Sequence, residues 1–338
     1  MKNVKFDWND ILIVPNETSE IRSRKEIDID RLPLFVAPMD TVVNKENAKL
    51  FYDKGFEVCL PRHIKSIEDL DFCFFSYGLE GIKKKLEISL EPFDDKKVLI
   101  DIANGNMEEL LIITEKFKKM YPDKILMVGN VANPMTYVKL SQAGADIVRC
   151  GVGGGSACLT TQQTGIGYPM ASLISECREM KIKYNLNSKI VSDGGFREYS
   201  EIIKSLALGS DGVMLGGILN KCLESCSPNF QKIYDDSYKE IHVDIALSNY
   251  QSKIPVYKYY RGMSTKEVQK DWGKESLQTS EGITKYNMVD YTLDGWVENF
   301  IDYLKTNMSY CGKRTTEEFI GKVEYVFITQ NAFNRYNK

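Results

Sequence analysis

Cys158 is the residue whose type and position most directly suggest chemistry. It lies in the run Gly153-Gly154-Gly155-Ser156-Ala157-Cys158-Leu159-Thr160, directly after the apolar stretch 145–152. A glycine-rich loop lets backbone come close to a ligand or ion, and a strand behind it fixes the loop's position. The pattern predicts a nucleophilic thiol on a loop at the end of a strand, with a reduced cysteine in a tight turn as the alternative.

Two further apolar runs end in glycine pairs that suit phosphate binding. They are followed by Ser192-Asp193-Gly194-Gly195 and by Leu215-Gly216-Gly217. Many barrels bind phosphate through backbone N–H groups in such loops, so a phosphorylated small molecule is expected. Because Asp193 would repel phosphate, it is interpreted as an acceptor for a pair of sugar hydroxyls, with helix capping as its alternative.

A parallel sheet is needed to position these loops, and the rest of the sequence predicts one. Eight short apolar runs alternate with segments of helical spacing. The runs are 33–39, 56–60, 72–77, 98–103, 125–128, 146–150, 189–192 and 212–215, and the helical segments include 107–120, 135–143, 170–184 and 199–208. Eight such units predict an α/β fold, a single closed (β/α)8 TIM barrel with its active site on the loops that follow the strands. An open doubly wound sheet is the alternative.

Polar residues and glycines gather at the ends of the predicted strands. Each group by itself is explained by a turn, but seven groups at one end of a barrel predict a functional rim. They are Met39-Asp40, Arg62-His63, 101–104, Gly129-Asn130, 150–158, Asp193-Gly194-Gly195 and Gly216-Gly217.

The whole chain, 1–338, is predicted to form one barrel domain. The alternation of runs and helical segments stops after the eighth run, and residues 229–257 are expected to form a surface excursion. A final helix at 293–305 is expected to close the barrel, followed by a C-terminal tail, 307–338. No internal repeat or low-complexity segment indicates a second domain.

Composition excludes several classes of protein. A hydrophobic content of 43% supports a large core, and a net charge of −3 with a pI near 5.7 argues against nucleic acid or an anionic membrane as a partner. No apolar window is long enough to span a membrane, and the first residues do not resemble a signal peptide, so a cytoplasmic protein is expected. Eight irregularly spaced cysteines predict reduced thiols, and with only two histidines a zinc site is not expected.

These motifs together resemble the IMP dehydrogenase and GMP reductase family. The resemblance runs from Phe6 to about Tyr325 and includes the cysteine loop and the Asp-Gly-Gly and Gly-Gly loops described above. Its other motifs are Ala37-Pro38-Met39-Asp40-Thr41-Val42, Asp101-Ile102-Ala103-Asn104-Gly105, Gly129-Asn130-Val131 and Tyr260-Arg261-Gly262-Met263-Ser264. Members of this family are (β/α)8 barrels, usually tetrameric, that bind a purine nucleotide and a nicotinamide cofactor on the rim.

Three features are more similar to the reductases than to the dehydrogenases. Only about a helix's length separates His63 from Phe72, where dehydrogenases usually carry inserted CBS regulatory domains. The interval 265–280 contains no arginine and so lacks the Arg-Tyr pair with which dehydrogenases activate water. The segment Thr164-Gly165-Ile166-Gly167-Tyr168-Pro169 looks like the reductase version.

The resemblance implies an NADPH-dependent oxidoreductase that converts GMP to IMP and ammonia. Cys158 matches the nucleophile that attacks C2 of GMP and forms a thioimidate, which then accepts hydride. Thr160 and Glu281 match the pair that protonates the departing ammonia, and an exposed loop carboxylate is the alternative for Glu281. The choice between NADPH and NADH is left open.

The family's binding residues carry over by position. Asp193 matches the ribose contact, and the phosphate and base contacts match Gly194, Gly195, Gly216, Gly217, Gly262, Met263, Ser264, Gln278, Ser280 and Gly282. Cofactor contacts match Arg62, Asp101, Ile102, Ala103, Met263, Met308, Ser309, Tyr310 and Cys311, with Ser23 and Arg24 at the adenosine end. The resemblance implies a homotetramer in which a neighbouring subunit contributes Ser23 and Arg24. Backbone carbonyls of Gly153, Gly155 and Cys158 match a potassium site.

Four positions depart from the family pattern. Gly154 stands where the family usually has proline, Leu159 where it has threonine, and Thr161 and Gln278 where it has arginine. These changes make the cysteine loop less rigid and less basic. The alternatives are therefore an IMP dehydrogenase without CBS domains, a reductase for a deoxy or modified purine nucleotide, and a catalytically weak homologue that binds nucleotide.

Overall fold

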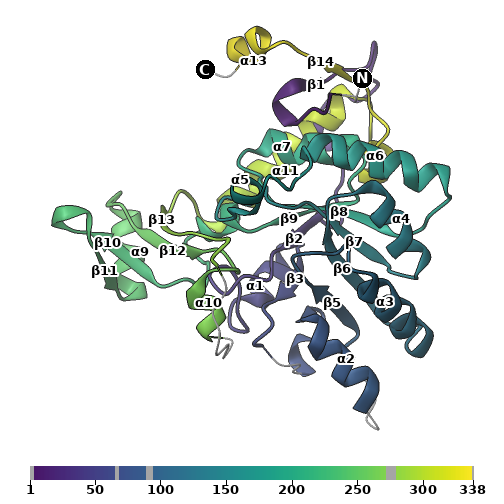
Figure 1. Cartoon of the computed structure of the whole chain (residues 1–338). Helices are drawn as coiled ribbons and strands as arrows, with labels where there is room; N and C mark the ends of the chain where they lie inside the picture. Colours follow the sequence, from purple (N-terminus) through teal and green to yellow (C-terminus); the bar gives the residue numbers. More distant parts are fainter. Residues whose placement is uncertain (1–3, 65–67, 89–93, 272–278, 337–338) are drawn as a thin grey trace.

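Eight parallel strands form a closed barrel in the computed structural model, which describes residues 4–64, 68–88, 94–271 and 279–336 (Figure 1). The last barrel strand pairs with the first, so the predicted (β/α)8 barrel is confirmed and the open sheet is excluded. In order round the barrel the strands are β2 (Leu34–Val36), β3 (Glu57–Leu60), β4 (Phe74–Tyr77), β5 (Lys97–Asp101), β6 (Ile125–Val131), β7 (Ile147–Cys150), β8 (Lys189–Asp193) and β9 (Gly212–Leu215).

Helices surround the barrel because each has one apolar face. They include α1 (Ala48–Asp53), α2 (Leu79–Ile88), α3 (Glu108–Met120), α4 (Pro134–Gln142), α6 (Met170–Lys183), α7 (Tyr199–Leu208) and α11 (Leu293–Tyr310). In α3, Leu110, Ile113 and Phe117 are buried at helical spacing. Asn133 caps the start of α4 through its side chain, and Gly209 ends α7 with a φ of 112°. No described helix is both long and apolar enough to cross a membrane.

The barrel interior has two layers with different chemistry. The lower layer is apolar and consists of Phe35, Cys59, Phe74, Leu99, Met127, Ile147, Val191 and Met214, all buried. Side chains of a strand alternate between its two faces, so the next inward position lies two residues further on. Within the strands this upper layer consists of Ser76, Asp101, Gly129, Arg149 and Asp193, and just past the strand ends the corresponding positions are Ala37, which still packs on the lower layer, Pro61 and Gly216. The switch from apolar to charged or small residues occurs where the strands end.

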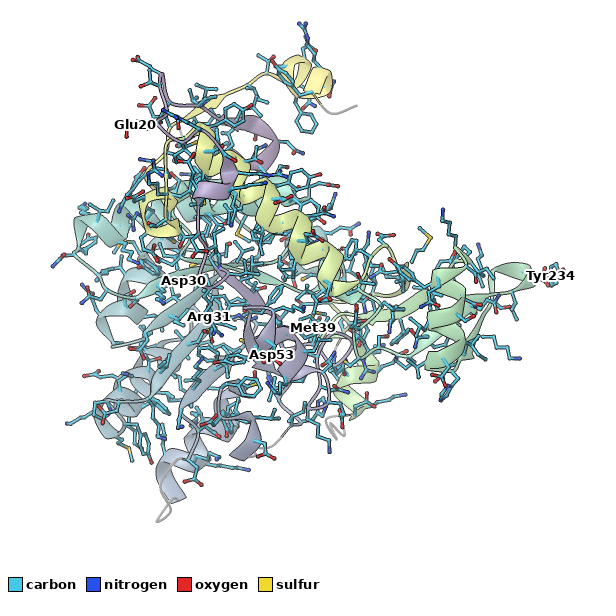
Figure 2. The ribbon with its side chains drawn as sticks, turned by 180° about the vertical axis from the view of Figure 1, so that it is seen from behind. Glu20, Asp30, Arg31, Met39, Asp53 and Tyr234 are labelled. Carbon is cyan, nitrogen blue, oxygen red and sulfur yellow. The ribbon has the colours of Figure 1, made fainter. Side chains whose placement is uncertain are left out.

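A four-stranded antiparallel sheet projects from the barrel, and we call residues 229–271 and 279–288 the arm (Figure 1). Its elements are β10 (Asn229–Lys232), β11 (Tyr238–Ile241), α9 (Val243–Gln251), β12 (Tyr257–Arg261), α10 (Lys266–Asp271) and β13 (Thr284–Met288). The expected excursion, 229–257, covers only part of this arm, because β12 and β13 extend the same sheet. Figure 2 shows Tyr234, in a short 3-10 turn, at the outer end of the arm.

The two ends of the chain lie on the same side of the barrel (Figure 1). There β1 (Ile11–Ile13) pairs antiparallel with β14 (Tyr325–Phe327), flanked by α12 (Thr316–Phe319) and α13 (Gln330–Tyr336). The expected tail, 307–338, therefore contains regular elements. It also begins inside α11, which continues to Tyr310 because Met308 and Cys311 still pack into the core.

Candidate active site

A cavity of about 520 Å³ opens at the carboxyl ends of the barrel strands, beside the arm. Its wall joins the loop after β7, the loops after β8 and β9, and the segments that flank α10. Most of the predicted site residues line it. They are Arg62, Asp101, Ile102, Ala103, Gly153, Gly155, Cys158, Thr160, Asp193, Gly194, Gly195, Gly216, Gly217, Gly262, Met263, Ser264 and Glu281.

The cysteine loop is held in place by backbone pairing with the segment before β13. Leu159 N–H donates to the Glu281 carbonyl at 2.7 Å, and Ile283 N–H donates to the Ala157 carbonyl at 3.0 Å. Cys158 and Gly282 are opposite each other in this short antiparallel bridge. Two segments more than a hundred residues apart are thereby fixed, with Cys158 and Glu281 on adjoining backbones.

The three predicted catalytic side chains form a continuous hydrogen-bonded chain. The Cys158 Sγ donates to Thr160 Oγ1 at 3.3 Å, and Thr160 Oγ1 donates to Glu281 Oε2 at 2.6 Å. Thr160 is the first residue of α5 (Thr160–Thr164) and is half-buried, as is Glu281. A hydroxyl placed between a thiol and a carboxylate can pass a proton in either direction.

Cys158 differs from the other cysteines in its surroundings. It is half-exposed at the cavity, whereas Cys226, also half-exposed, does not line that cavity, and Cys59, Cys73, Cys150, Cys177, Cys222 and Cys311 are buried. Burial raises the pKa of the Cys73 thiol to about 12 and also raises that of Cys59. Since the thiolate is the reactive form, these buried thiols are unreactive packing residues.

The glycine loop after β8 meets the backbone of the cysteine loop, and the loop after β9 meets the Ser156 side chain. Gly194 and Gly195 have φ values of 101° and 88°, a conformation that favours glycine. A Cβ at Gly195 would lie 2.8 Å from the Gly154 carbonyl oxygen. A Cβ at Gly217 would lie 2.9 Å from Ser156 Oγ. Such close backbone approach is the arrangement in which N–H groups can surround a phosphate.

The predicted sugar-binding carboxylate, Asp193, is oriented by two neighbours. Its Oδ2 accepts from Asn130 Nδ2 at 2.8 Å and from Arg149 Nη2 at 2.6 Å. No hydrogen bond between described residues involves its Oδ1, and Asp193 lines the cavity. Glu198, not Asp193, occupies the N-cap position of α7, so the helix-cap alternative is excluded.

Arg149 joins Asp193 to Asp101 across the barrel mouth. Only 6% of the Arg149 side chain is exposed, and its Nη1 donates to Asp101 Oδ1 at 2.8 Å. Arg62 Nε also donates to Asp101, at 2.9 Å. Burial by itself would raise the pKa of Asp101, but the charges of Arg62 and Arg149 outweigh it and hold that pKa below 3.8. Two arginines and two carboxylates thus form a nearly neutral network beneath the cavity.

The predicted base-binding segment lies on the arm side of the cavity. Gly262, Met263 and Ser264 line it directly. Ser280 and Gly282 flank Glu281, and Ser280 Oγ donates to the Gly282 carbonyl at 2.7 Å. Gln278 lies outside the described residues.

The predicted cofactor residues fall into two separate groups. Arg62, Asp101, Ile102, Ala103 and Met263 line the cavity. The second group, which comprises Ser23, Arg24, Met308, Ser309, Tyr310 and Cys311, lies where the segment before β2 packs on the end of α11. In that group Arg24 Nη2 pairs with Asp302 at 2.9 Å, Tyr310 is exposed, and Met308 and Cys311 are buried. Within the residues that the structure describes, the second group does not line the cavity that the first group lines.

The potassium site expected at the carbonyls of Gly153, Gly155 and Cys158 stays a prediction. The Gly155 carbonyl also accepts the Cys158 N–H at 2.9 Å, and the Thr161 side chain packs over Gly153. In the part of the chain that the structure describes, no three His, Cys, Asp or Glu side chains gather as a metal site. A cation here would therefore depend on backbone oxygens.

Several residues that line the cavity were not among the predicted site residues. Met39, Asn130 and Ser156 were expected only as part of the rim and Tyr260 only as part of a family motif, and Arg149, Phe196, Gln269 and Thr279 were not expected there. For Arg149 a signal was present, because a charged residue inside an otherwise apolar strand needs a buried partner. Gln269 gave no such signal, since α10 reads as an ordinary polar helix.

Known proteins resemble the chain over its whole length. The model of the "IMP dehydrogenase / GMP reductase domain" matches residues 90–337. The chain is 28% identical to a GMP reductase of Buchnera aphidicola, an alignment that covers 100% of this chain and 99% of the relative. It is 27% identical to human GMP reductase 2, covering 98% and 96%, and 26% identical to a Vibrio vulnificus GMP reductase, covering 100% and 98%. The chain therefore belongs to the IMP dehydrogenase and GMP reductase family and is most like the GMP reductases.

Proposed function

We propose that this protein is a GMP reductase that converts GMP, NADPH and two protons to IMP, ammonium and NADP⁺. The observation that carries the proposal is the chain of hydrogen bonds from Cys158 through Thr160 to Glu281 at the cavity wall. The reductase names of the full-length relatives support the same reaction.

In this proposal Cys158 attacks C2 of the purine, and the C2 amino group leaves as ammonia. The thiol proton passes through the Thr160 hydroxyl to Glu281, which leaves the thiolate as nucleophile. The same relay then returns a proton to the departing amine, because ammonia is a far better leaving group than an amide ion. C2 is left bonded to sulfur as a thioimidate. After reduction of C2 the C–S bond breaks, IMP is released and the Cys158 thiol is restored.

The nucleotide would lie between the glycine loops and the arm. Gly194, Gly195, Gly216 and Gly217 would bind the 5′-phosphate through backbone N–H groups. The free Oδ1 of Asp193 would accept the ribose hydroxyls, since Asn130 and Arg149 already hold its Oδ2. The segment Gly262-Met263-Ser264 would contact the base.

In this proposal a nicotinamide would lie beside Cys158, among cavity residues that suit it. Ile102 and Met263 offer apolar surface, and Arg62 and Asp101 offer paired polar groups. When bound, NADPH supplies the hydride that reduces C2. Arg24 is a suitable partner for the 2′-phosphate, because a guanidinium binds phosphate well.

We further propose a homotetramer in which a neighbouring subunit completes the cofactor site. The separation of Ser23, Arg24 and residues 308–311 from the cavity of their own chain supports this arrangement. Potassium bound by the Gly153, Gly155 and Cys158 carbonyls would stiffen the cysteine loop. Removal of potassium would then lower kcat, and addition of potassium would restore it.

The proposal is tested by incubating the purified protein with GMP and NADPH. We expect equal amounts of reduced cofactor lost, ammonia formed and IMP formed. Reduction of NAD⁺ only in the presence of IMP would identify a dehydrogenase instead. A much higher kcat/KM with a deoxy or modified nucleotide would reassign the substrate, and tight GMP binding with no turnover would identify a binding protein.

A further inference from the structure

A lysine on the arm lies behind the tyrosine that contacts the glycine loops. Lys285 on β13 is the direct cross-strand partner of Tyr260 on β12. Its Nζ is 5.5 Å from the centre of the Tyr260 ring. A Cβ at Gly216 or Gly217 would lie 3.4 Å or 3.5 Å from the Tyr260 hydroxyl oxygen. One aromatic ring therefore separates the Lys285 ammonium from the loops proposed to bind phosphate.

Two other cations lie near Lys285. Arg197 follows Gly195 by two residues, and Lys221 directly follows α8 (Gly217–Asn220), so each continues one of the two glycine loops. Burial lowers the pKa of Lys285, and the like charges of Lys221 and Arg197 lower it further. The geometric link to the phosphate loops is therefore the stacking of Lys285 on Tyr260 and the position of Arg197 two residues after Gly195.

The charge of this group is only partly compensated. Lys221 Nζ pairs with Asp290 Oδ2 at 2.7 Å. Among the ion pairs that the described residues form, none involves the side chain of Lys285 or of Arg197. Glu201, near Arg197, accepts the backbone N–H of that residue at 2.6 Å and not its guanidinium. Two positive charges remain without an ion-pair partner.

A phosphate dianion at the glycine loops needs such charge. The loops offer only neutral N–H groups, and the charged side chains that line the cavity give no net positive charge: two arginines, Arg62 and Arg149, against Asp101, Asp193 and Glu281. In physiological salt, charges within about 8 Å interact without contact. We propose that Lys285 and Arg197 form a cationic pair that attracts and holds the 5′-phosphate, so that the site selects nucleoside monophosphates over nucleosides. This inference rests on the proposed phosphate role of the loops.

The test replaces each cation and separates binding from chemistry. In Lys285→Met and in Arg197→Gln we expect KM for GMP to rise about 5- to 20-fold while kcat changes less than about twofold. Lys285→Arg keeps the charge and should restore KM to near the wild-type value. Lys239→Met is the matched control, because Lys239 is on β11, at the opposite edge of the same sheet from Lys285. This variant also loses one positive charge, and we expect its KM for GMP to equal that of wild type.

Ionic strength gives a readout that a structural role would not change. The KM for GMP should rise more steeply with salt concentration in wild type than in Lys285→Met. Salt screens the attraction between the Lys285 charge and the phosphate, and the variant lacks that attraction at any salt concentration. Guanosine affinity, measured by calorimetry, should be the same in both proteins. An unchanged KM in both cation variants, or an equal loss of affinity for guanosine and GMP, would overturn the inference.

Failure of the proposed function gives a different pattern. If the wild type binds GMP but does not reduce it, the reductase proposal fails. The comparison of GMP and guanosine affinity then still decides the role of Lys285. If Lys285→Met does not fold, Arg197→Gln carries the test by itself.

Discussion

The two layers of the barrel interior are built by the same eight strands, yet their chemistry is opposite. The lower layer contains only apolar or thiol side chains, all buried. The upper layer, two residues further along each strand, contains Asp101, Arg149 and Asp193, together with small residues. Two residues along each strand thus separate the side chains that stabilise the barrel from those that face the cavity. The difference predicts that substitutions in the two layers, and on the rim above, will affect different measurements.

The largest contrast is expected between two cysteines. Cys158→Ala on the rim should lower kcat for GMP more than about 10⁴-fold, because it removes the nucleophile, with little change in Tm. Cys59→Ala in the lower layer should lower the free energy of unfolding by about 1 to 2 kcal/mol and leave kcat unchanged. Steady-state kinetics and thermal unfolding of both variants check this. An equal loss of kcat in the two variants would contradict the expectation that only the rim cysteine takes part in the reaction.

The proton relay is the next largest effect. Glu281→Gln should lower kcat about 10²- to 10³-fold with less than about a threefold change in the Kd for GMP, because the amide cannot supply the proton. Single-turnover ammonia release and GMP calorimetry measure the two quantities. If Kd rises as much as kcat falls, Glu281 holds the substrate and does not move a proton.

A matched pair within β5 compares the layers directly. Leu99→Ala should lower the free energy of unfolding by about 2 to 5 kcal/mol through the cavity it leaves, with near-normal kcat at low temperature. Asp101→Asn should lower kcat/KM about 10-fold or more and destabilise the fold less than Leu99→Ala does, because the amide retains some hydrogen bonds. Chemical denaturation and kinetics of the two proteins decide. A larger stability loss in Asp101→Asn would show that the upper layer is also structural.

The smallest effect concerns acid stability. Burial by itself would raise the pKa of Asp101 in the folded protein. The charges of Arg62 and Arg149 outweigh burial and lower that pKa. Its contribution to stability is therefore complete above the ordinary value of 3.8 and is lost as pH falls through the lower folded value. Below pH 4 the free energy of unfolding should therefore fall less steeply with decreasing pH in Asp101→Asn than in wild type. Equal slopes in the two proteins would show that the charge of Asp101 does not contribute to stability.

The sequence allowed the barrel to be predicted because each strand is a short apolar run followed by a turn residue. The arm was only partly predicted. Its sheet pairs Tyr257 with Met288 and Phe230 with Tyr257, contacts between distant segments with no alternating apolar pattern. The strand pattern alone also did not indicate that Glu281 lies beside Cys158, since that depends on a backbone bridge between distant loops. Only the family resemblance brought those two residues together.

The role of Arg149 could not be predicted from the sequence of its own strand. Its role comes from Asp101 and Asp193 on two other strands, and the register of the parallel strands places all three at one height. Gly194 and Gly195 were easier to interpret, because a glycine pair after a strand already indicates a tight loop. Residues whose function depends on a distant partner are the ones that sequence patterns miss.

The most direct test of the account compares wild type with Cys158→Ala in the presence of GMP and NADPH. We predict that wild type consumes reduced nicotinamide and releases ammonia and IMP in equal amounts, while the folded variant still binds GMP and releases none. Turnover by the variant, or ammonia release without cofactor oxidation in wild type, would contradict a cysteine adduct that accepts hydride.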